Sequence, residues 1–179
     1  MPNFLYVDNS NVWIEGMHVA AVAAGVAPDI WTAQDRNITA PWSYDFGRLL
    51  YFAGGEKDDV GRAVLYGSRP PKNDSLWASA ERQGFEVVVY DRNAANREKK
   101  IDTQITADMI EDSYERMKSD RDEITLVSGD KDYVPAIEKL RKRHFTVHVV
   151  FWEHAARELR EAATKFIALD PYLEHLRRR

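Results

Sequence analysis

The chain has 179 residues, of which 44% are hydrophobic and 30% charged, a composition that allows a globular protein with a sizeable core. It contains no cysteine, which excludes disulfides, thiolate zinc sites and a cysteine nucleophile. The net charge of −4 argues against a protein that coats nucleic acid through overall basicity, but it allows an enzyme whose acids gather at a metal site.

The length predicts a single domain over residues 1–179. The first residues, Met1-Pro2-Asn3-Phe4, lack the basic and apolar regions of an export signal. No apolar run approaches the roughly 20 residues needed to span a bilayer. We therefore expect a cytoplasmic protein without a membrane partner.

Short apolar runs alternate with helical patterns along the chain, which is typical of βαβ units. Strands are expected at Phe4–Val7, Arg62–Tyr66, Phe85–Tyr90, Ile124–Val127, Phe145–Phe151 and Phe166–Leu169. Helices are expected at Ser43–Phe52, Ser75–Gln83, Asp102–Lys118, Tyr133–Arg143 and His154–Thr164, with a last helical turn after Pro171. Continuous apolar runs indicate parallel strands that are buried on both faces. The sequence therefore predicts an α/β fold with a mostly parallel sheet.

Residues 17–42, between the first strand and the first of these helices, form the least regular segment. The alanine-rich stretch Val19–Val26 favours a helix that stops near Gly25 and Pro28. We expect residues 17–42 to be an insertion that packs as a surface flap, with a lid over the ligand crevice as the alternative.

Acidic motifs follow two of the expected strands. Asp8-Asn9-Ser10-Asn11 comes after the first strand, and Ser128-Gly129-Asp130-Lys131-Asp132 comes after the fourth. Ligands of open α/β sheets bind beyond the carboxyl ends of the strands, and close carboxylates repel unless a cation lies between them. The pair of motifs predicts a site for a hard cation. Alternatively, each motif is a turn whose acid caps a helix.

The helix expected at Asp102–Lys118 carries a third set of acids. Its predicted buried stripe consists of Thr106, Met109, Ile110, Ser113, Tyr114 and Met117. Asp102 is in phase with this stripe, and an inward carboxylate needs a capping role, a basic partner or a metal. Asp108 instead groups with Gln104, Glu111, Asp112 and Glu115 on what periodicity predicts to be a solvated acidic face.

Taken together, the three motifs resemble the NYN domain family of PIN-like, metal-dependent ribonucleases. The motifs are Val7-Asp8-Asn9-Ser10-Asn11, Lys100-Ile101-Asp102 with Asp108, and Val127-Ser128-Gly129-Asp130-Lys131-Asp132-Tyr133. They occur in the family's order and span most of the chain. The resemblance implies a three-layer α/β/α fold. One departure is His144, which stands where the family often has glycine after the Tyr133–Arg143 helix.

The resemblance also implies the site residues. The catalytic set would be Asp8, Asn11, Asp102, Asp108, Asp130 and Asp132, and the metal ligands Asp8, Asp102, Asp108 and Asp130. Asp8 and Asp130 are the expected direct ligands, and Asn11 would hydrogen-bond to a water or a phosphate oxygen. Oxygen-only ligands favour Mg²⁺ or Mn²⁺, which can activate water and neutralise charge on a phosphate.

Basic residues near the central helix are candidates for binding RNA. Arg92, Arg97, Lys99 and Lys100 lie at or beyond the third strand's end and could neutralise phosphates, or they could form a solvated basic loop. Ser10 and Ser128 are further candidate substrate contacts. The tryptophans Trp13, Trp31, Trp42 and Trp77 could stack on bases but are more typical of a core. The terminal Arg177-Arg178-Arg179 has no assigned role.

Three functions remain open on this sequence. The first is a metal-dependent ribonuclease with RNA as its partner, and the second is a non-catalytic RNA-binding or scaffold module of the same fold. The third is a haloacid-dehalogenase-like phosphatase, because Gly129-Asp130 with Asp132 resembles that family's last acidic motif. That chemistry requires a second acid two residues after Asp8, where Ser10 stands. A homodimer is compatible with the sequence, which leaves the oligomeric state open.

Overall fold

The computed structural model describes residues 1–69, 74–91 and 97–179, apart from the side chains of residues 69 and 97–99. A parallel sheet of six strands, in the order β3-β2-β1-β4-β5-β6, forms its centre. The strands are β1 Asn3–Asp8, β2 Val60–Arg69, β3 Glu86–Asp91, β4 Glu123–Val127, β5 Thr146–Phe151 and β6 Lys165–Ala168. Each expected strand is confirmed, with ends that differ by a few residues.

Helices connect the strands. They are α1 Asn9–Ala23, α2 Ile30–Asp35, α3 Phe46–Gly54, α4 Asp74–Gln83, α5 Arg97–Glu115, α6 Val134–Lys142, α7 Arg157–Ala162 and α8 Leu173–Leu176. Short 3-10 turns lie at Lys57–Asp59, Lys131–Tyr133 and Asp170–Tyr172. Within the described ranges, no helix has both the length and the apolar character that crossing a bilayer would require.

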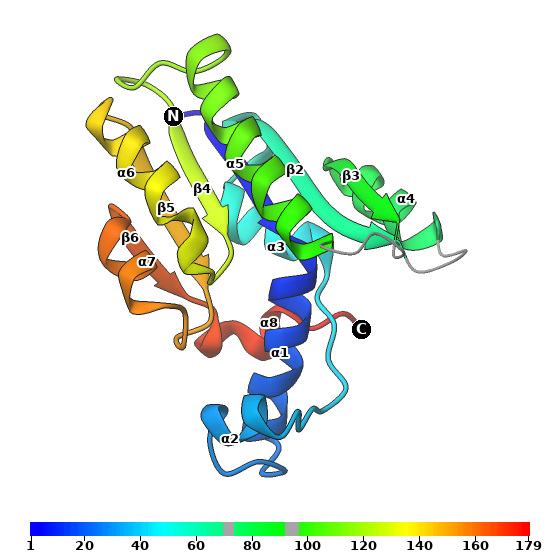
Figure 1. Ribbon diagram of the computed structural model, residues 1–179. Helices are drawn as coiled ribbons and strands as arrows, with labels where there is room; N and C mark the ends of the chain where they lie inside the picture. The colour runs from blue at the N-terminus through cyan, green and yellow to red at the C-terminus, as the bar shows by residue number, and fades with distance from the viewer. Residues whose placement is uncertain (70–73, 92–96) are drawn as a thin grey trace.

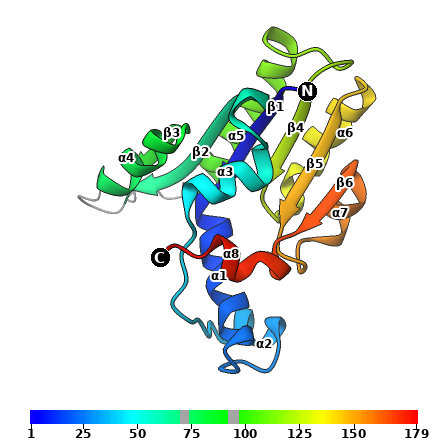
Figure 2. The same ribbon diagram turned by 180° about the vertical axis from the view of Figure 1, so that it is seen from behind.

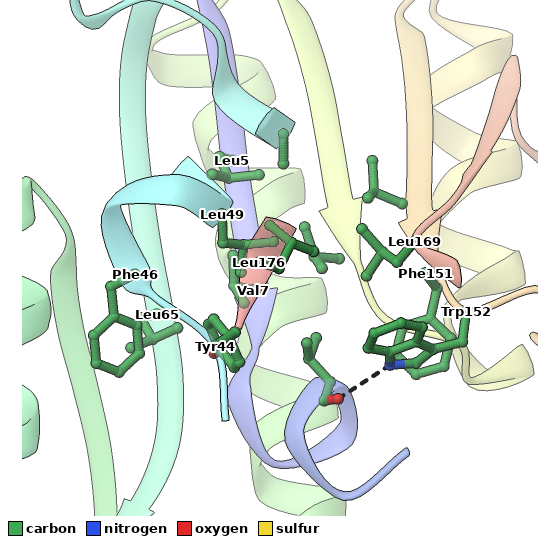
Figure 3. Close-up of a cluster of buried hydrophobic side chains, with 14 of the residues drawn as sticks. Leu5, Val7, Tyr44, Phe46, Leu49, Leu65, Phe151, Trp152, Leu169 and Leu176 are labelled. Atoms are coloured by element: carbon green, nitrogen blue, oxygen red, sulfur yellow. Dashed lines mark hydrogen bonds between the residues drawn. The ribbon is translucent and has the colours of Figure 1, made fainter. Parts of the chain in front are cut away.

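The helices form a layer on each face of the sheet. Helices α5, α6 and α7 cover one face, and α3, α4 and α8 cover the other (Figures 1 and 2). On the α3 face, Trp152 is fully buried, and its indole N–H donates a hydrogen bond of 3.1 Å to the carbonyl of Val12 in α1 (Figure 3). The expected three-layer α/β/α architecture is therefore confirmed.

The segment after β1 is more helical than its sequence indicated. Helix α1 begins at Asn9, ten residues before the helix expected at Val19–Val26, and ends at Ala23. Residues 17–42 thus contribute the second half of α1, all of α2 and the extended chain that returns to α3. Helix α2 packs against α1 through small buried residues that include Ala21 and Ala33. Both helices extend from the edge of the sheet at which the strands end (Figure 1).

The expected buried stripe of α5 was partly wrong. Met109 and Ser113 are buried as predicted, but Tyr114 is 70% exposed. Asp112, expected on the solvated face, is only 2% exposed because it accepts a hydrogen bond of 2.6 Å from Tyr6 and pairs with Arg62. The buried face of the helix is rotated toward these partners on β1 and β2.

A left-handed residue ends α6. The N–H groups of His144 and Phe145 donate to the carbonyls of Arg141 and Leu140, which is the Schellman pattern. His144 has φ +66°, a conformation that costs a residue with a Cβ more than it costs glycine. This geometry explains why glycine suits the position.

Candidate metal centre

The two strand-end acidic motifs lie at the ends of β1 and β4, the neighbouring strands in the middle of the sheet. The chain adds β2 and β3 on one side of this pair, and β5 and β6 on the other. Strand β1 pairs with β2 on one side and β4 on the other, so Asp8 and the turn after Val127 lie at adjacent strand ends. This change of side opens a crevice at the carboxyl edge, where open α/β sheets bind ligands.

Asp8 ends β1 and caps α1. The Asp8 carboxylate is buried and accepts the N–H of Asn11 at 3.2 Å, as expected for an acid before a helix. The side-chain oxygen of Asn11 accepts the N–H of Gly129 at 3.3 Å, which connects the start of α1 to the turn after β4. The two strand-end motifs are therefore in direct contact.

The turn after β4 presents Asp130 and Asp132. Gly129 permits this turn because a Cβ at that position would collide with the ring of Phe151 on β5. The carboxylate of Asp130 accepts the N–H of Asp132 at 2.9 Å and so caps the 3-10 turn Lys131–Tyr133. Ser128 is fully buried, and its hydroxyl accepts the N–H of Asp130 at 3.5 Å. Ser128 supports the turn from within.

Asp102 comes from the first part of α5, across the crevice. Tyr133, which is fully buried, donates its phenolic proton to Asp102 Oδ1 at 2.8 Å. Burial, together with the negative charges of Asp8, Asp102 and Asp130, raises the pKa of the Tyr133 phenol far above its ordinary value of 10.0. Three carboxylates from three separate elements therefore act on one phenol.

The residues that could hold a cation are Asp102, Asp130 and Asp132. One carboxylate oxygen from each lies within 4.8 Å of the others. At Mg²⁺–O distances of 2.0–2.1 Å, two opposite ligand oxygens are about 4.2 Å apart and two adjacent ones about 2.9 Å, so the three carboxylates would move closer together to share one ion. The all-oxygen donor set fits Mg²⁺ or Mn²⁺. Asp132 is exposed and Asp130 half-buried, which leaves an approach from solvent.

A pocket of about 270 Å³ adjoins this cluster. Asp8, Asp102 and Asp130 line it, together with Ser10, Asn11, Ile14, Glu15 and Ile101. Asp8 thus faces the same space as Asp102 and Asp130, although it lies outside the tighter group of three. The structure brings together every predicted acid except Asp108.

Glu15 was missed by the sequence reasoning. Its carboxylate accepts a hydrogen bond of 2.9 Å from Gln34 and contacts His154 Nε2 at 2.7 Å. Burial opposes ionisation, but these two partners hold the pKa of Glu15 below its ordinary value of 4.5. The available signal was its spacing four residues after Asn11, which places both on one helical face once α1 is taken to begin at Asn9.

Asp108 lies apart from the cluster, farther along α5. Its carboxylate accepts hydrogen bonds from Tyr66 at 2.6 Å and from Gln104 at 2.8 Å. Six residues of α-helix separate it from Asp102, an axial rise of about 9 Å. Asp108 is thus half-buried against β2 and not on the solvated face that periodicity predicted, and the ligand role implied by the family resemblance stays a prediction.

The expected cationic contacts are only partly described. Arg92 lies outside the described residues, as do the side chains of Arg97 and Lys99. Lys100 lies in the first turns of α5 and is exposed, two residues before Asp102.

Comparison with known proteins decides the family. The NYN domain matches residues 12–170. The chain belongs to the NYN domain family. Its fold is accordingly of the PIN-like nuclease type. The chain is also similar to "Low amplitude and bright protein LabA" of Synechococcus elongatus, with 31% identity over 155 residues and coverage of 79% of each chain. The crystal structure of a protein of unknown function from Vibrio parahaemolyticus has the same fold, with a TM-score of 0.68, 22% identity and coverage of 99% of this chain and 96% of that one.

Proposed function

We propose that this NYN domain is a metal-dependent ribonuclease that hydrolyses phosphodiester bonds at the carboxyl edge of β1 and β4. The observation that carries the proposal is the approach of the Asp102, Asp130 and Asp132 carboxylates to within 4.8 Å of one another. Family membership favours RNA over other phosphodiesters.

The residues present fit an Mg²⁺ or Mn²⁺ site. Asp102 and Asp130 would hold the ion from opposite sides of the crevice, with Asp132 beside them at the solvent edge. Asp8, across the same pocket, adds negative charge that favours a cation. Such an ion lowers the pKa of water and neutralises charge on phosphate oxygens.

The neighbouring side chains support binding and orientation. Tyr133 donates a hydrogen bond to Asp102 and so orients this carboxylate at the edge of the pocket. Asn11 lines the pocket while its own position is fixed through Gly129, so its amide can orient a phosphate oxygen or an attacking water. Lys100, exposed near Asp102, is a candidate phosphate contact, and Arg92, Arg97 and Lys99 are proposed to extend it.

A cleavage assay tests the proposal. Purified protein is incubated with end-labelled single-stranded RNA in Mg²⁺, in Mn²⁺ or in EDTA. We expect cleavage only with metal. The cleavage rate should fall about 100-fold or more in Asp130→Asn, because a neutral amide is a weaker metal ligand than a carboxylate. Asp58→Asn, at an exposed acid in the 3-10 turn before β2, is the matched control and should cleave normally.

Other outcomes identify the competing functions. RNA binding that persists in EDTA without cleavage in any metal would favour a binding module. Turnover of a small phosphomonoester with RNA left intact would favour a phosphatase.

Metal binding can be measured without RNA. Binding of Mn²⁺ alone, followed by the electron paramagnetic resonance of the free ion, should weaken in Asp130→Asn and not in Asp58→Asn.

A further inference from the structure

A second hollow lies beside the acidic pocket, on the other side of Ser10. Its volume is also about 270 Å³, near the lower end of the roughly 300–1,000 Å³ of small-molecule sites. Ser10 lines both hollows, so the two adjoin there. The residues that matter for its chemistry are Ser10, Trp13, Tyr44, Phe46, Trp77 and Arg178. The lining of this hollow is therefore mainly aromatic and carries little charge.

Trp13 is an exposed aromatic surface that is held in place. Its side chain is 43% exposed, although it belongs to a helix that packs on the core. Its indole N–H donates a hydrogen bond of 2.9 Å to the carbonyl of Trp42, which fixes the orientation of the ring. A ring that is both exposed and fixed costs little entropy when another aromatic group stacks on it.

Trp77 is a second tryptophan in the wall of the hollow. It is 5% exposed, and its indole N–H is buried without a hydrogen-bond partner among the described residues. The ring lies close against β2, since a Cβ on Gly67 would fall 2.5 Å from it. Because this N–H is shielded, Trp77 contributes its packed ring to the hollow.

The C-terminal residues complete the hollow. The N–H of Arg178 donates to the carbonyl of Ser43 at 2.8 Å, and Arg177 forms a β-bridge with Tyr44. These contacts hold the end of the chain beside the segment that leads to α3 (Figure 2). Arg178, for which the sequence suggested no role, therefore lines the hollow, and arginine is suited to contacts with aromatic rings and phosphates.

We propose that this hollow binds one nucleobase of the single-stranded RNA whose phosphodiester occupies the acidic pocket. The inference rests on the proposed ribonuclease function and specifies which part of the substrate positions the scissile bond. The base stacks on Trp13 in a hollow that Trp77 also lines, while Ser10 lies between base and phosphate. The substrate is therefore an unpaired nucleotide, because a base inside a duplex cannot enter a pocket.

Two measurements in EDTA test the pocket without depending on cleavage. The first follows the five indole N–H signals in a ¹H–¹⁵N spectrum during titration with uridine or adenosine monophosphate. The second measures the affinity for a short single-stranded RNA, intact or lacking one base at successive positions. We expect Trp13 and Trp77 signals to move and the Trp31 signal to stay. Trp13→Ala should weaken binding of intact RNA about 10-fold, the effect of one lost base stack, and should not further weaken binding of RNA that lacks the pocketed base.

Trp31→Ala is the matched control, because Trp31 is 65% exposed on α2 and does not line the hollow. Stationary Trp13 and Trp77 signals together with unchanged affinity of Trp13→Ala would overturn the base pocket, even if metal-dependent cleavage is observed. Signals that move in a protein that never cleaves RNA would instead overturn the ribonuclease function and leave the nucleotide pocket in place. An equal loss of affinity in Trp31→Ala would also overturn the pocket.

Discussion

Tyr133 donates a hydrogen bond of 2.8 Å to Asp102, a residue 31 positions away in the sequence. This bond joins α5 to the turn after β4, the two elements that supply the proposed metal ligands. Because burial and the surrounding carboxylates raise the pKa of Tyr133 far above 10.0, the phenol keeps its proton and remains a donor throughout the neutral range. Its role is to position one ligand.

Removal of this hydroxyl should weaken both metal binding and the fold. In Tyr133→Phe we expect the Mn²⁺ concentration for half-maximal cleavage to rise about 10–100-fold, the usual effect of losing a group that orients a metal ligand. The free energy of unfolding should fall by about 1.5–3 kcal/mol, since a bond to a charged acceptor is lost. Metal titration and urea denaturation measure the two effects, with Tyr172→Phe, at a partly exposed tyrosine, as the control. An unchanged metal requirement would remove Tyr133 from the site.

Substitution of Asp108 should lower the stability of the fold without changing metal binding. Its carboxylate accepts hydrogen bonds from Tyr66 and Gln104 at a distance from the acidic cluster. In Asp108→Asn we expect the free energy of unfolding to fall by about 1.5–3 kcal/mol, since bonds to a charged acceptor are lost. The metal concentration for half-maximal cleavage should stay within about 2-fold. Glu111→Gln, at an exposed acid of the same helix, should change neither quantity. A large rise in the metal requirement with normal stability would return Asp108 to the ligand set.

The sheet could be predicted because its strands are buried. Runs such as Phe4–Val7 and Ile124–Val127 are apolar on both faces, and this pattern needs no knowledge of distant contacts. The polar residues that follow these runs then lie at adjacent strand ends, which brought Asp8 and Asp130 to one pocket. The site was predictable wherever it depends on strand ends.

The phase of α5 and the start of α1 could not be predicted in this way. Asp112 is buried because Tyr6 and Arg62, from β1 and β2, supply its hydrogen bonds and charge. No local pattern contains that information. Asp8 was considered as a helix cap, but polar residues also form turns and a helix was expected only at Val19–Val26, so Glu15 was missed. Both errors arise where tertiary contacts decide between two local interpretations.

The stability of the turn before β4 should depend on pH through Asp122. Burial opposes ionisation of this residue, but Arg121 and the N–H of Lys118, at 2.7 Å, hold the pKa of its carboxyl below the ordinary value of 3.8. A lowered folded-state pKa adds stability that is present above about pH 4 and is lost as the pH falls through the folded value. We expect Asp122→Asn to be less stable than the natural protein by about 1–3 kcal/mol at pH 7.

This difference should shrink below pH 3.8 and stay constant from pH 5 to pH 7. Urea denaturation at successive pH values measures it. Asp120→Asn, at an exposed acid of the same turn, is the control and should follow the natural protein throughout. A difference that grows on acidification would contradict the lowered pKa.

His144 offers a substitution that should stabilise the fold without touching the site. Its φ of +66° follows α6 at the amino edge of the sheet, opposite the carboxyl edge that carries the acids. In His144→Gly, relief of roughly 1–2 kcal/mol of left-handed strain exceeds the roughly 0.5–1 kcal/mol cost of glycine's freedom in the unfolded chain. We expect the free energy of unfolding to rise by about 0.5–1 kcal/mol and RNA cleavage to stay unchanged. His144→Ala keeps a Cβ in the same conformation and should give no such gain, so equal stabilisation by both variants would show that the backbone strain is not the cause.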